Sequence, residues 1–226
     1  MIPTPGAEAL IHQLKAIADS ETLAMQSRYG IATGNSLGVS LYDVRRICKG
    51  VHDHSLALDL WNSGIHEARI MAAIVDIPAE VTREQMDAWV ADFDSWDVCD
   101  QVTTGLFDQT PYAVEAVFDW AKREEEFVRR AAFSTIAGLS VHNRSMTDED
   151  FTRFFPLIVK YSTDPRNFVK KAVNWALRNI GKRNAELCRK AIAIASQMKE
   201  SGDRTARWIA SDALRELNAR ITKGFK

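Results

Sequence analysis

The segment Lys170-Lys171-Ala172-Val173-Asn174-Trp175-Ala176-Leu177-Arg178 places basic residues directly before a small and apolar stripe at helical spacing. A similar order recurs in three other segments: Glu67-Ala68-Arg69-Ile70-Met71-Ala72-Ala73, Arg129-Arg130-Ala131-Ala132-Phe133 and Ala206-Arg207-Trp208-Ile209-Ala210. Their separations of roughly 35 to 60 residues suit one or two helix pairs per step of a stacked array. Because any amphipathic helix carries such a stripe, unrelated amphipathic helices are the alternative.

The whole chain has a helical pattern. Glycine and proline are sparse (11 and 6), and apolar residues recur at helical spacing from about residue 7 to about residue 220 without strand-like alternation. Helix starts are expected at Thr82, Thr110, Thr147 and Thr163-Asp164-Pro165, in helices of roughly ten to seventeen residues. We therefore predict an all-α, superhelical solenoid of HEAT-like repeats with a concave cleft. It is expected to form a single domain over residues 1–226, with flexible ends from Met1 to about Gly6 and from about Thr222 to Lys226.

Composition excludes several classes of protein. The chain has 226 residues, of which 46% are hydrophobic and 26% charged, enough to bury a core. No stretch is long and apolar enough for a membrane span, and the N-terminus lacks a leader pattern, so a cytoplasmic protein is expected. Cys48, Cys99 and Cys188 are odd in number and far apart, which argues against disulfides and structural zinc. His52-Asp53-His54 is interpreted as a solvated loop, and neither metal nor cofactor is expected.

The formal net charge of −1 conceals an asymmetry. Residues 151–226 contain 17 Lys and Arg against 6 Asp and Glu, whereas residues 1–150 contain 12 against 24. This distribution suggests a polyanionic partner for the C-terminal third. A solvated helix surface with balanced ends is an equally good interpretation of the charges by themselves.

In the segment Ser95-Trp96-Asp97-Val98-Cys99-Asp100-Gln101-Val102, an aromatic residue and a carboxylate stand four positions apart. On a helix, Trp96 and Asp100 therefore share one face, which suits the handling of a cation. Arg130 and Trp175 open further segments of the same style. In a solenoid, these four residues can line one concave surface.

These segments, taken in order, resemble the AlkD-type HEAT-like-repeat DNA alkylation repair glycosylases. The likeness rests on a Trp-Asp-x-x-Asp helix start at Trp96, an Arg-Ala-Ala helix at Arg130, and a Lys-Ala-x-x-Trp-x-Leu-Arg helix from Lys171 to Arg178. Further matching pieces are Arg28-Tyr29, Leu37-Gly38-Val39-Ser40 followed by Arg45-Arg46, and Leu60-Trp61 followed by His66-Glu67-Ala68-Arg69. The likeness runs from about residue 25 to about residue 217. Ser95 departs from it, because the family often has a second aromatic residue there.

The resemblance implies a monomer that binds duplex DNA containing alkylated purines. It makes Trp96 and Trp175 the aromatic walls of the site and Asp100 the catalytic carboxylate. It makes Arg130 a phosphate-contacting cation, with Tyr29 as a further cleft residue. Lys170, Lys171 and Arg178 stand close enough in sequence to Trp175 to neutralise phosphates as well.

The chemistry suits these residues. An N3- or N7-alkylated purine is already a cation and leaves readily, so the remaining task is to stabilise positive charge on the sugar and to activate water. A carboxylate such as Asp100 does both, and the indole faces of Trp96 and Trp175 attract cations.

Structural interpretations of the same residues stay open. Trp96 and Trp175 can be core residues, Asp100 can favour the helix dipole, and Arg130 can pair with a carboxylate on a neighbouring helix. Trp61, Trp89, Trp120 and Trp208 are expected in the core or between helices, and His66, Glu67 and Arg69 in a buried polar link between repeats. The alternative functions are a noncatalytic DNA-binding protein and a protein-interaction solenoid.

Overall fold

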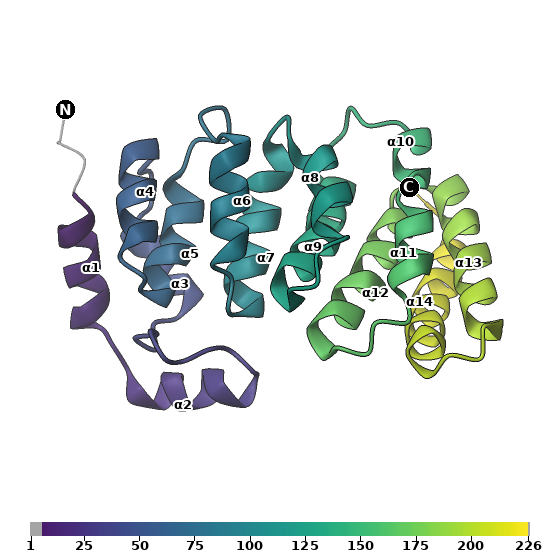
Figure 1. Cartoon of the computed structure of the whole chain (residues 1–226), viewed down its shortest axis with the longest axis horizontal. Coiled ribbons are helices and arrows are strands. Elements are labelled where there is room, and N and C mark those ends of the chain that lie inside the picture. Colours follow the sequence, from purple (N-terminus) through teal and green to yellow (C-terminus); the bar gives the residue numbers. More distant parts are fainter. Residues whose placement is uncertain (1–5, 226) are drawn as a thin grey trace. The chain divides into compact units, whose positions relative to one another are not determined.

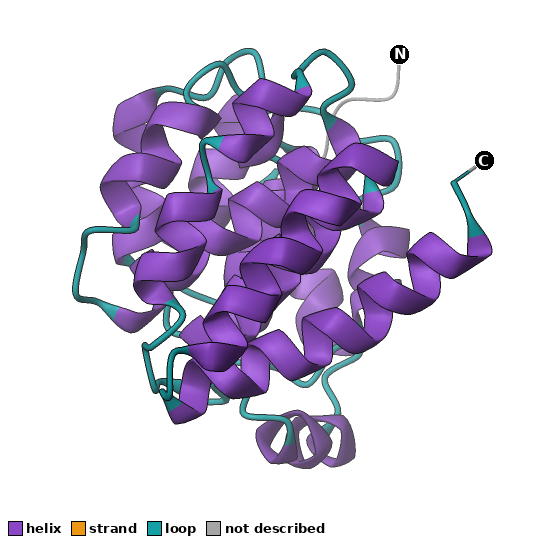
Figure 2. Cartoon of the chain, turned by 90° about the vertical axis from the view of Figure 1, so that its right-hand side faces the viewer, coloured by secondary structure: helices purple, strands orange, loops and turns teal. Residues whose placement is uncertain are grey.

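The computed structural model describes residues 6–225, and every regular element in that range is a helix. Figure 2 shows purple helices joined by teal loops. The described range contains fourteen α-helices and one 3-10 helix, which confirms the all-α prediction. The predicted helix lengths were too uniform: seven of these α-helices are shorter than ten residues, and α14 has twenty.

The chain divides into two compact units, the first ending at Thr110 and the second beginning at Pro111. The first unit contains α1 (Ala7–Ala16), α2 (Ser20–Arg28), α3 (Leu41–Ile47), α4 (His54–Asn62), α5 (His66–Val75), α6 (Arg83–Ala91), α7 (Trp96–Gly105) and η1 (Phe107–Gln109) (Figure 1). The second contains α8 (Ala113–Trp120), α9 (Glu126–His142), α10 (Asp148–Thr152), α11 (Phe155–Tyr161), α12 (Asn167–Lys182), α13 (Ala185–Glu200) and α14 (Arg204–Lys223). The expected single domain over residues 1–226 concerns both units together and stays a prediction.

The structure corrects the flexible end that was expected at the C-terminus. The expected flexible N-terminus, Met1 to about Gly6, falls mostly on residues 1–5, which lie outside the described residues. At the other end, α14 continues through Lys223, so the tail expected from Thr222 begins as helix. The Thr222 hydroxyl donates to the carbonyl of Asn218 at 2.8 Å, which continues the helical pattern of contacts. Lys226 lies outside the described residues.

Two of the expected helix starts are confirmed by their capping hydrogen bonds. The Thr82 hydroxyl accepts from the backbone N–H of Gln85 at 3.1 Å, at the start of α6. Thr147 and Asp150 form a reciprocal capping box at the start of α10. These bonds satisfy N–H groups that a helix start leaves without an intrahelical partner.

The other two expected starts were placed too early. The Thr110 hydroxyl donates to the carbonyl of Phe107 at 2.8 Å, and α8 begins three residues later. Asp164 accepts from the side chain of Arg166 at 2.9 Å, and α12 follows without a side-chain cap. In both cases the polar side chain satisfies a tertiary or turn contact instead of a helix N–H.

Tryptophan side chains anchor the core of each unit. Trp61 and Trp89 are buried in the first unit and stack with ring centroids 4.0 Å apart, and Trp120 is buried in the second, all as predicted. Trp208 was expected in the core or between helices; it is 43% exposed and therefore lies outside the core. The buried stripe of α14 runs along Ala206, Ile209, Ala210, Ala213 and Leu217, and Trp208 falls outside it. Its ring instead lies 5.0 Å from the Lys170 ammonium.

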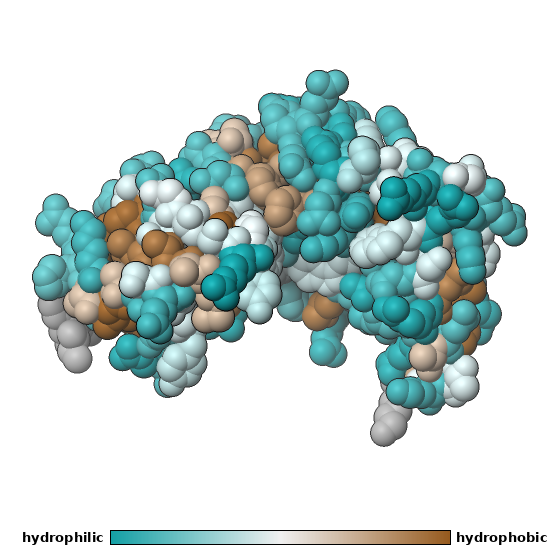
Figure 3. Space-filling model, turned by 90° about the horizontal axis from the view of Figure 1, so that it is seen from below, coloured by the Kyte–Doolittle hydropathy of each residue, from teal (hydrophilic) through white to brown (hydrophobic). Residues whose placement is uncertain are grey.

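The packing of helices within each unit agrees with the predicted repeats. In the second unit α12 packs against both α9 and α14. The amide of Asn179 on α12 donates to the carbonyl of Ala137 on α9 at 3.2 Å. In the first unit, the Arg69 guanidinium donates to the carbonyl of Asp92 at 3.1 Å. This contact gives the predicted polar link, but at a partly exposed position and not at a buried one. The face seen in Figure 3 is mostly hydrophilic, as expected where such helices meet solvent.

Candidate functional site

Helix α7 places Trp96 and Asp100 on one face, as the four-residue spacing predicts. Trp96 is the first residue of the helix, and its indole N–H donates to the carbonyl of Tyr29 at 3.1 Å. This bond fixes the ring, while the Tyr29 side chain is exposed. Asp100 lies beyond the first turn, where the helix dipole acts most weakly on a side chain, so the dipole interpretation of Asp100 is disfavoured.

A pocket of about 270 Å³ opens beside this face of α7. Both Trp96 and Asp100 line it. The other lining residues come from α2, α3, α5, α7 and the segment that joins α2 to α3: Gln26, Ile31, Val39, Leu41, His66, Ile70, Asp97 and Gln101. The pocket therefore combines apolar side chains with two carboxylates and a histidine.

The histidine and one of the carboxylates form a buried pair. His66 Nε2 lies 2.8 Å from Asp97 Oδ2, and both side chains are less than a fifth exposed. The Ser95 hydroxyl donates to the other carboxylate oxygen at 2.6 Å and accepts from the N–H of Ala32 at 3.2 Å. Ser95 thus joins the segment after α2 to the start of α7.

The contact between His66 and Asp97 shifts the pKa of each side chain toward its charged form. Burial lowers the pKa of His66, but the hydrogen bond and charge of Asp97 outweigh it and raise the pKa above its ordinary value of 6.5. Burial likewise raises the pKa of Asp97, but His66 and then Ser95 lower it below the ordinary value of 3.8.

This coupling makes the stability of the protein depend on pH. His66 makes its full contribution to folding stability below pH 6.5, and this contribution is lost as the pH rises through its raised pKa. The contribution of Asp97 to folding stability is present above pH 3.8 and is lost as the pH falls through its lowered pKa.

His66→Gln should therefore lower the free energy of unfolding by about 1.5–3 kcal/mol at pH 5.5 and by less at pH 9, as measured by urea unfolding. His12→Gln, on the exposed face of α1, is the matched control. An equal loss at both pH values would contradict a contribution of His66 that is lost as the pH rises.

Glu67 holds the segment that forms one wall of the pocket. Its fully buried carboxylate accepts from the backbone N–H groups of Leu37 and Val39 at 2.9 and 3.0 Å, and from the Ser36 hydroxyl at 2.7 Å. Gly38 lies between them at φ +75°, where a Cβ would approach the carbonyl of Asp19 to 2.1 Å. The buried polar link predicted for Glu67 is confirmed, and its partner is this loop.

In the second unit, α12 carries the remaining predicted aromatic wall and three predicted cations. Trp175 is partly exposed, Lys171 is exposed, and Lys170 lies over the Trp208 ring. The Arg178 guanidinium contacts Glu216 at 2.5 Å and Asp212 at 3.4 Å, both on α14. Of these cations, Lys171 is the most accessible to an external phosphate, and the phosphate contact of Arg178 stays a prediction.

Arg130 is almost entirely buried, with 5% of its surface exposed. One of its guanidinium N–H groups donates to the carbonyl of Phe168 at 2.7 Å, at the start of α12. The structure thus gives Arg130 an internal contact between repeats through the backbone carbonyl of Phe168. Its phosphate contact stays a prediction.

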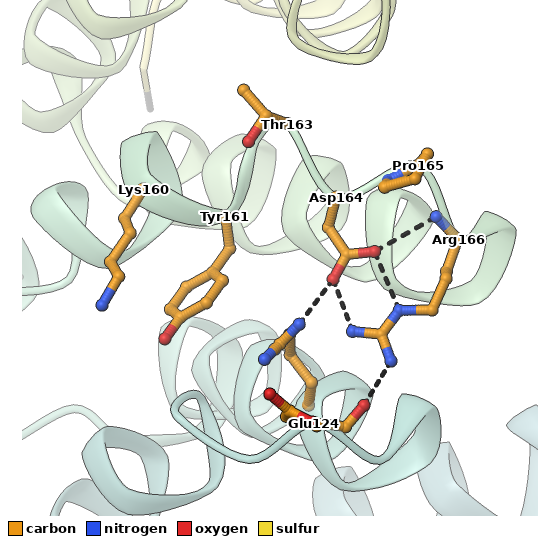
Figure 4. A pocket seen from close by; sticks show the side chains of 8 residues that line it. Glu124, Lys160, Tyr161, Thr163, Asp164, Pro165 and Arg166 are labelled. Atoms are coloured by element: carbon orange, nitrogen blue, oxygen red, sulfur yellow. Dashed lines mark hydrogen bonds and ion pairs between the residues drawn. The ribbon is translucent and has the colours of Figure 1, made fainter.

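A second cavity, of about 460 Å³, lies where α11 leads into α12. In Figure 4 the Asp164 carboxylate points toward Arg166, which also donates to the backbone of Glu124. Arg129 completes the cluster at 2.8 Å from Asp164. Burial raises the pKa of Asp164, but the hydrogen bonds from Arg166 and Arg129 lower it to about 2. We interpret this cluster as a link that positions the start of α12.

Sequence reasoning placed Asp97 only in a helical turn and His66 only in a link between repeats. It did not find that the two form a pair in the wall of the pocket beside Asp100. A signal was present: His66 and Asp97 occupy the first and second positions of α5 and α7, two helices that pack together. The structure describes Trp96 and Asp100 on one unit and Arg130 and Trp175 on the other, and their common cleft stays a prediction.

Comparison with protein families matches residues 10–217 to the family described as DNA alkylation repair enzyme. The chain belongs to this DNA alkylation repair family. The match covers most of the sequence, including α7 and α12, and so includes every candidate site residue. It confirms the family suggested by the Trp96, Arg130 and Trp175 segments.

Comparison with solved structures shows which fold this member of the DNA alkylation repair family has. One similar protein belongs to a family related to the HEAT-like repeat DNA glycosylases and is described as having affinity for branched DNA structures. It is 17% identical, with a TM-score of 0.77 over 93% of this chain and 95% of that chain, which shows a shared HEAT-like repeat fold.

Two further similar structures are an engineered protein and a designed armadillo repeat protein. The first is 15% identical, with a TM-score of 0.45 over 96% of this chain and 100% of that chain. The second is 15% identical, with a TM-score of 0.39 over 95% and 100%. A comparison with curated proteins found no match. Within residues 6–225, none of the helices combines the length and apolar character that a membrane crossing requires.

Proposed function

We propose that this protein is a DNA glycosylase that removes cationic N3- or N7-alkylated purines from duplex DNA. The observation that carries the proposal is the shared pocket of Trp96 and Asp100 on α7, in a chain of the DNA alkylation repair family. The indole offers a face that attracts cations, and the carboxylate offers a negative charge beside it.

In the proposed reaction, water attacks the anomeric carbon of the sugar while the bond to the purine nitrogen breaks. The purine leaves with the bonding electrons and so loses its positive charge, and therefore needs no acid. Asp100 stabilises the positive charge that develops on the sugar and accepts the proton of the attacking water. Trp175 supplies the second aromatic wall, and Arg130, Lys170, Lys171 and Arg178 supply the DNA contacts.

The direct test is release of free base from duplex DNA treated with a methylating agent. We expect the purified protein to release 7-methylguanine or 3-methyladenine, detected by chromatography, while untreated DNA releases no base. Bound DNA without base release would instead support the noncatalytic alternative. That alternative gains weight from the structural relative with affinity for branched DNA, so a four-way junction should be compared with a linear duplex.

Phosphate contacts should make the binding of DNA strongly dependent on salt. Lys171 is the most accessible of the predicted DNA-binding cations on α12. Lys171→Gln should weaken binding to all duplex sequences alike and lower the slope of log K against log salt by about one unit, because one counterion fewer is released.

Lys199→Gln, an exposed lysine at the end of α13, is the matched control for the lost charge and should leave the slope unchanged. Fluorescence anisotropy at several salt concentrations measures both variants. Equal slopes for Lys171→Gln and the unmodified protein would remove Lys171 from the DNA interface. Salt-independent or absent binding by the unmodified protein would favour a protein-interaction solenoid.

A further inference from the structure

Trp208 on α14 is an exposed aromatic residue that the proposed reaction does not use. It is 43% exposed and lies outside the buried stripe of its helix. Its ring has a cation–π contact with Lys170 on α12, whose ammonium lies 5.0 Å from the ring centroid. The exposed part of the indole is flat and apolar, so it offers a surface on which another planar group can stack.

Basic side chains accompany this ring on both helices. Arg204 stands four positions before Trp208 and so shares its face of α14, and Arg207 directly precedes the tryptophan. On α12, which packs against α14, the exposed Lys171 follows Lys170. In the part of the chain that the structure describes, Arg204, Arg207 and Lys171 have no ion-pair partner. We call these four cations and Trp208 the α14 surface.

The two arginines do not serve the helix that carries them. Arg204 is the first residue of α14 and Arg207 the fourth, and the first turn contains no acidic residue. The helix dipole disfavours cations at this end. Asp203 caps the helix by accepting from the backbone N–H groups of Thr205 and Ala206, each at 2.8 Å. The positive charge of the arginines is therefore available to an anion outside the protein.

The acidic residues of α14 do not cancel this charge. The helix contains two, Asp212 and Glu216, and both contact Arg178 on α12, at 3.4 and 2.5 Å. Glu216 also pairs with Lys182. The amide of Asn174 donates to Asp212 at 2.7 Å, which further ties α12 to α14. These carboxylates are thus occupied within the protein, and their contacts hold together the two helices that carry the α14 surface.

Cations beside an exposed aromatic ring match the chemistry of single-stranded DNA. The phosphates of a strand are attracted to the cations, and an unpaired base has a face that can stack on an indole. In a duplex the bases cover each other's faces, so binding would need the cations and would make no use of the ring. An acidic peptide likewise would need the charges alone.

We propose that the α14 surface binds single-stranded DNA, with one unpaired base stacked on Trp208 and the neighbouring phosphates beside the cations. The surface belongs to the second unit, whereas the pocket beside α7 belongs to the first. The proposal does not depend on base excision, and it gives the Arg204–Arg215 segment of α14 a role.

The test compares the affinity of the protein for a fluorescein-labelled strand of about 16 thymidines, long enough for one site of this kind, with its affinity for an undamaged blunt duplex of equal length. Fluorescence anisotropy measures both. Trp208→Ala should lower the ratio of single-strand to duplex affinity by roughly 5- to 100-fold, the range for loss of one aromatic stacking partner.

Conservative variants separate stacking from other effects of the substitution. Trp208→Phe keeps a ring and should retain most of the ratio, whereas Trp208→Leu keeps an apolar side chain without a ring and should behave like Trp208→Ala. Tyr112→Ala is the matched control, because Tyr112 is a 36% exposed aromatic residue of the same unit outside the α14 surface; the ratio should stay unchanged. Thermal unfolding checks that each variant is folded.

A second measurement reports the contact directly. A strand with 5-iododeoxyuridine at its centre couples under ultraviolet light to an aromatic ring on which that base is stacked. After digestion with trypsin, which cleaves after Arg207 and Arg215, we expect the coupled base on the peptide of residues 208–215.

An unchanged ratio in folded Trp208→Ala, a retained ratio in Trp208→Leu, or coupling only to other peptides would each overturn the inference. So would an unmodified protein that does not bind the single strand. Base release from methylated duplex is measured in parallel. Its absence would refute the glycosylase proposal and leave the single-strand site in place, whereas release with an unchanged ratio would do the reverse.

Discussion

Asp100→Asn is expected to lower the rate of base release by roughly 100- to 1,000-fold, or about 2.7–4 kcal/mol in the barrier. The amide keeps the shape of the side chain and loses its negative charge, so it forfeits a stabilisation that develops only in the transition state. DNA affinity and stability should stay nearly unchanged, because a carboxylate makes no attractive contact with phosphates and the amide has the same size and shape. Single-turnover release of 7-methylguanine at equal DNA occupancy measures the effect.

Asp59→Asn, an exposed carboxylate on α4 outside the pocket, is the matched control and should release base at the unmodified rate. Equal rates for Asp100→Asn and the unmodified protein would remove Asp100 from the mechanism. A loss of stability with preserved activity would give Asp100 a structural role instead. If the unmodified protein releases no base at all, the noncatalytic alternative takes the place of the whole reaction.

Glu67→Ala is expected to have the largest effect on stability, with a loss of roughly 2–6 kcal/mol. The change leaves the N–H groups of Leu37 and Val39 without their acceptor, and each buried unsatisfied donor costs about 1–3 kcal/mol. Val39 also lines the pocket beside α7, so the loosened segment should reduce base release as well. Urea unfolding measures the stability, and limited proteolysis within residues 31–40 measures the loosening.

Glu67→Gln keeps one acceptor oxygen and should lose less stability than Glu67→Ala. Glu84→Ala, at an exposed position in the first turn of α6, is the matched control and should cost no more than about 1 kcal/mol. If Glu67→Ala and Glu84→Ala proved equally stable, the hydrogen bonds of Glu67 would be worth no more than those of a solvated carboxylate.

The sequence by itself determined the features that depend on residues within one or two helical turns of each other. The helical period, the caps at Thr82 and Thr147, and the common face of Trp96 and Asp100 all follow from residues three or four positions apart. The ordered segments around Trp96, Arg130 and Trp175 also identified the family correctly. The misplaced starts at Thr110 and Asp164 show the limit of the same reasoning, because there tertiary and turn contacts take the polar side chain.

Tertiary structure decided the contacts between repeats. His66 and Asp97 lie 31 positions apart, and the contact of Arg130 with the Phe168 carbonyl spans 38, so no local pattern specifies either pair. Packing buried Arg130 against the start of α12, a contact that the sequence did not predict. The pocket beside Asp100 has the same origin, because its walls come from α2, α3, α5 and α7. Helix periodicity determines which side chains share a face, whereas the stacking of helices determines which residues each face packs against.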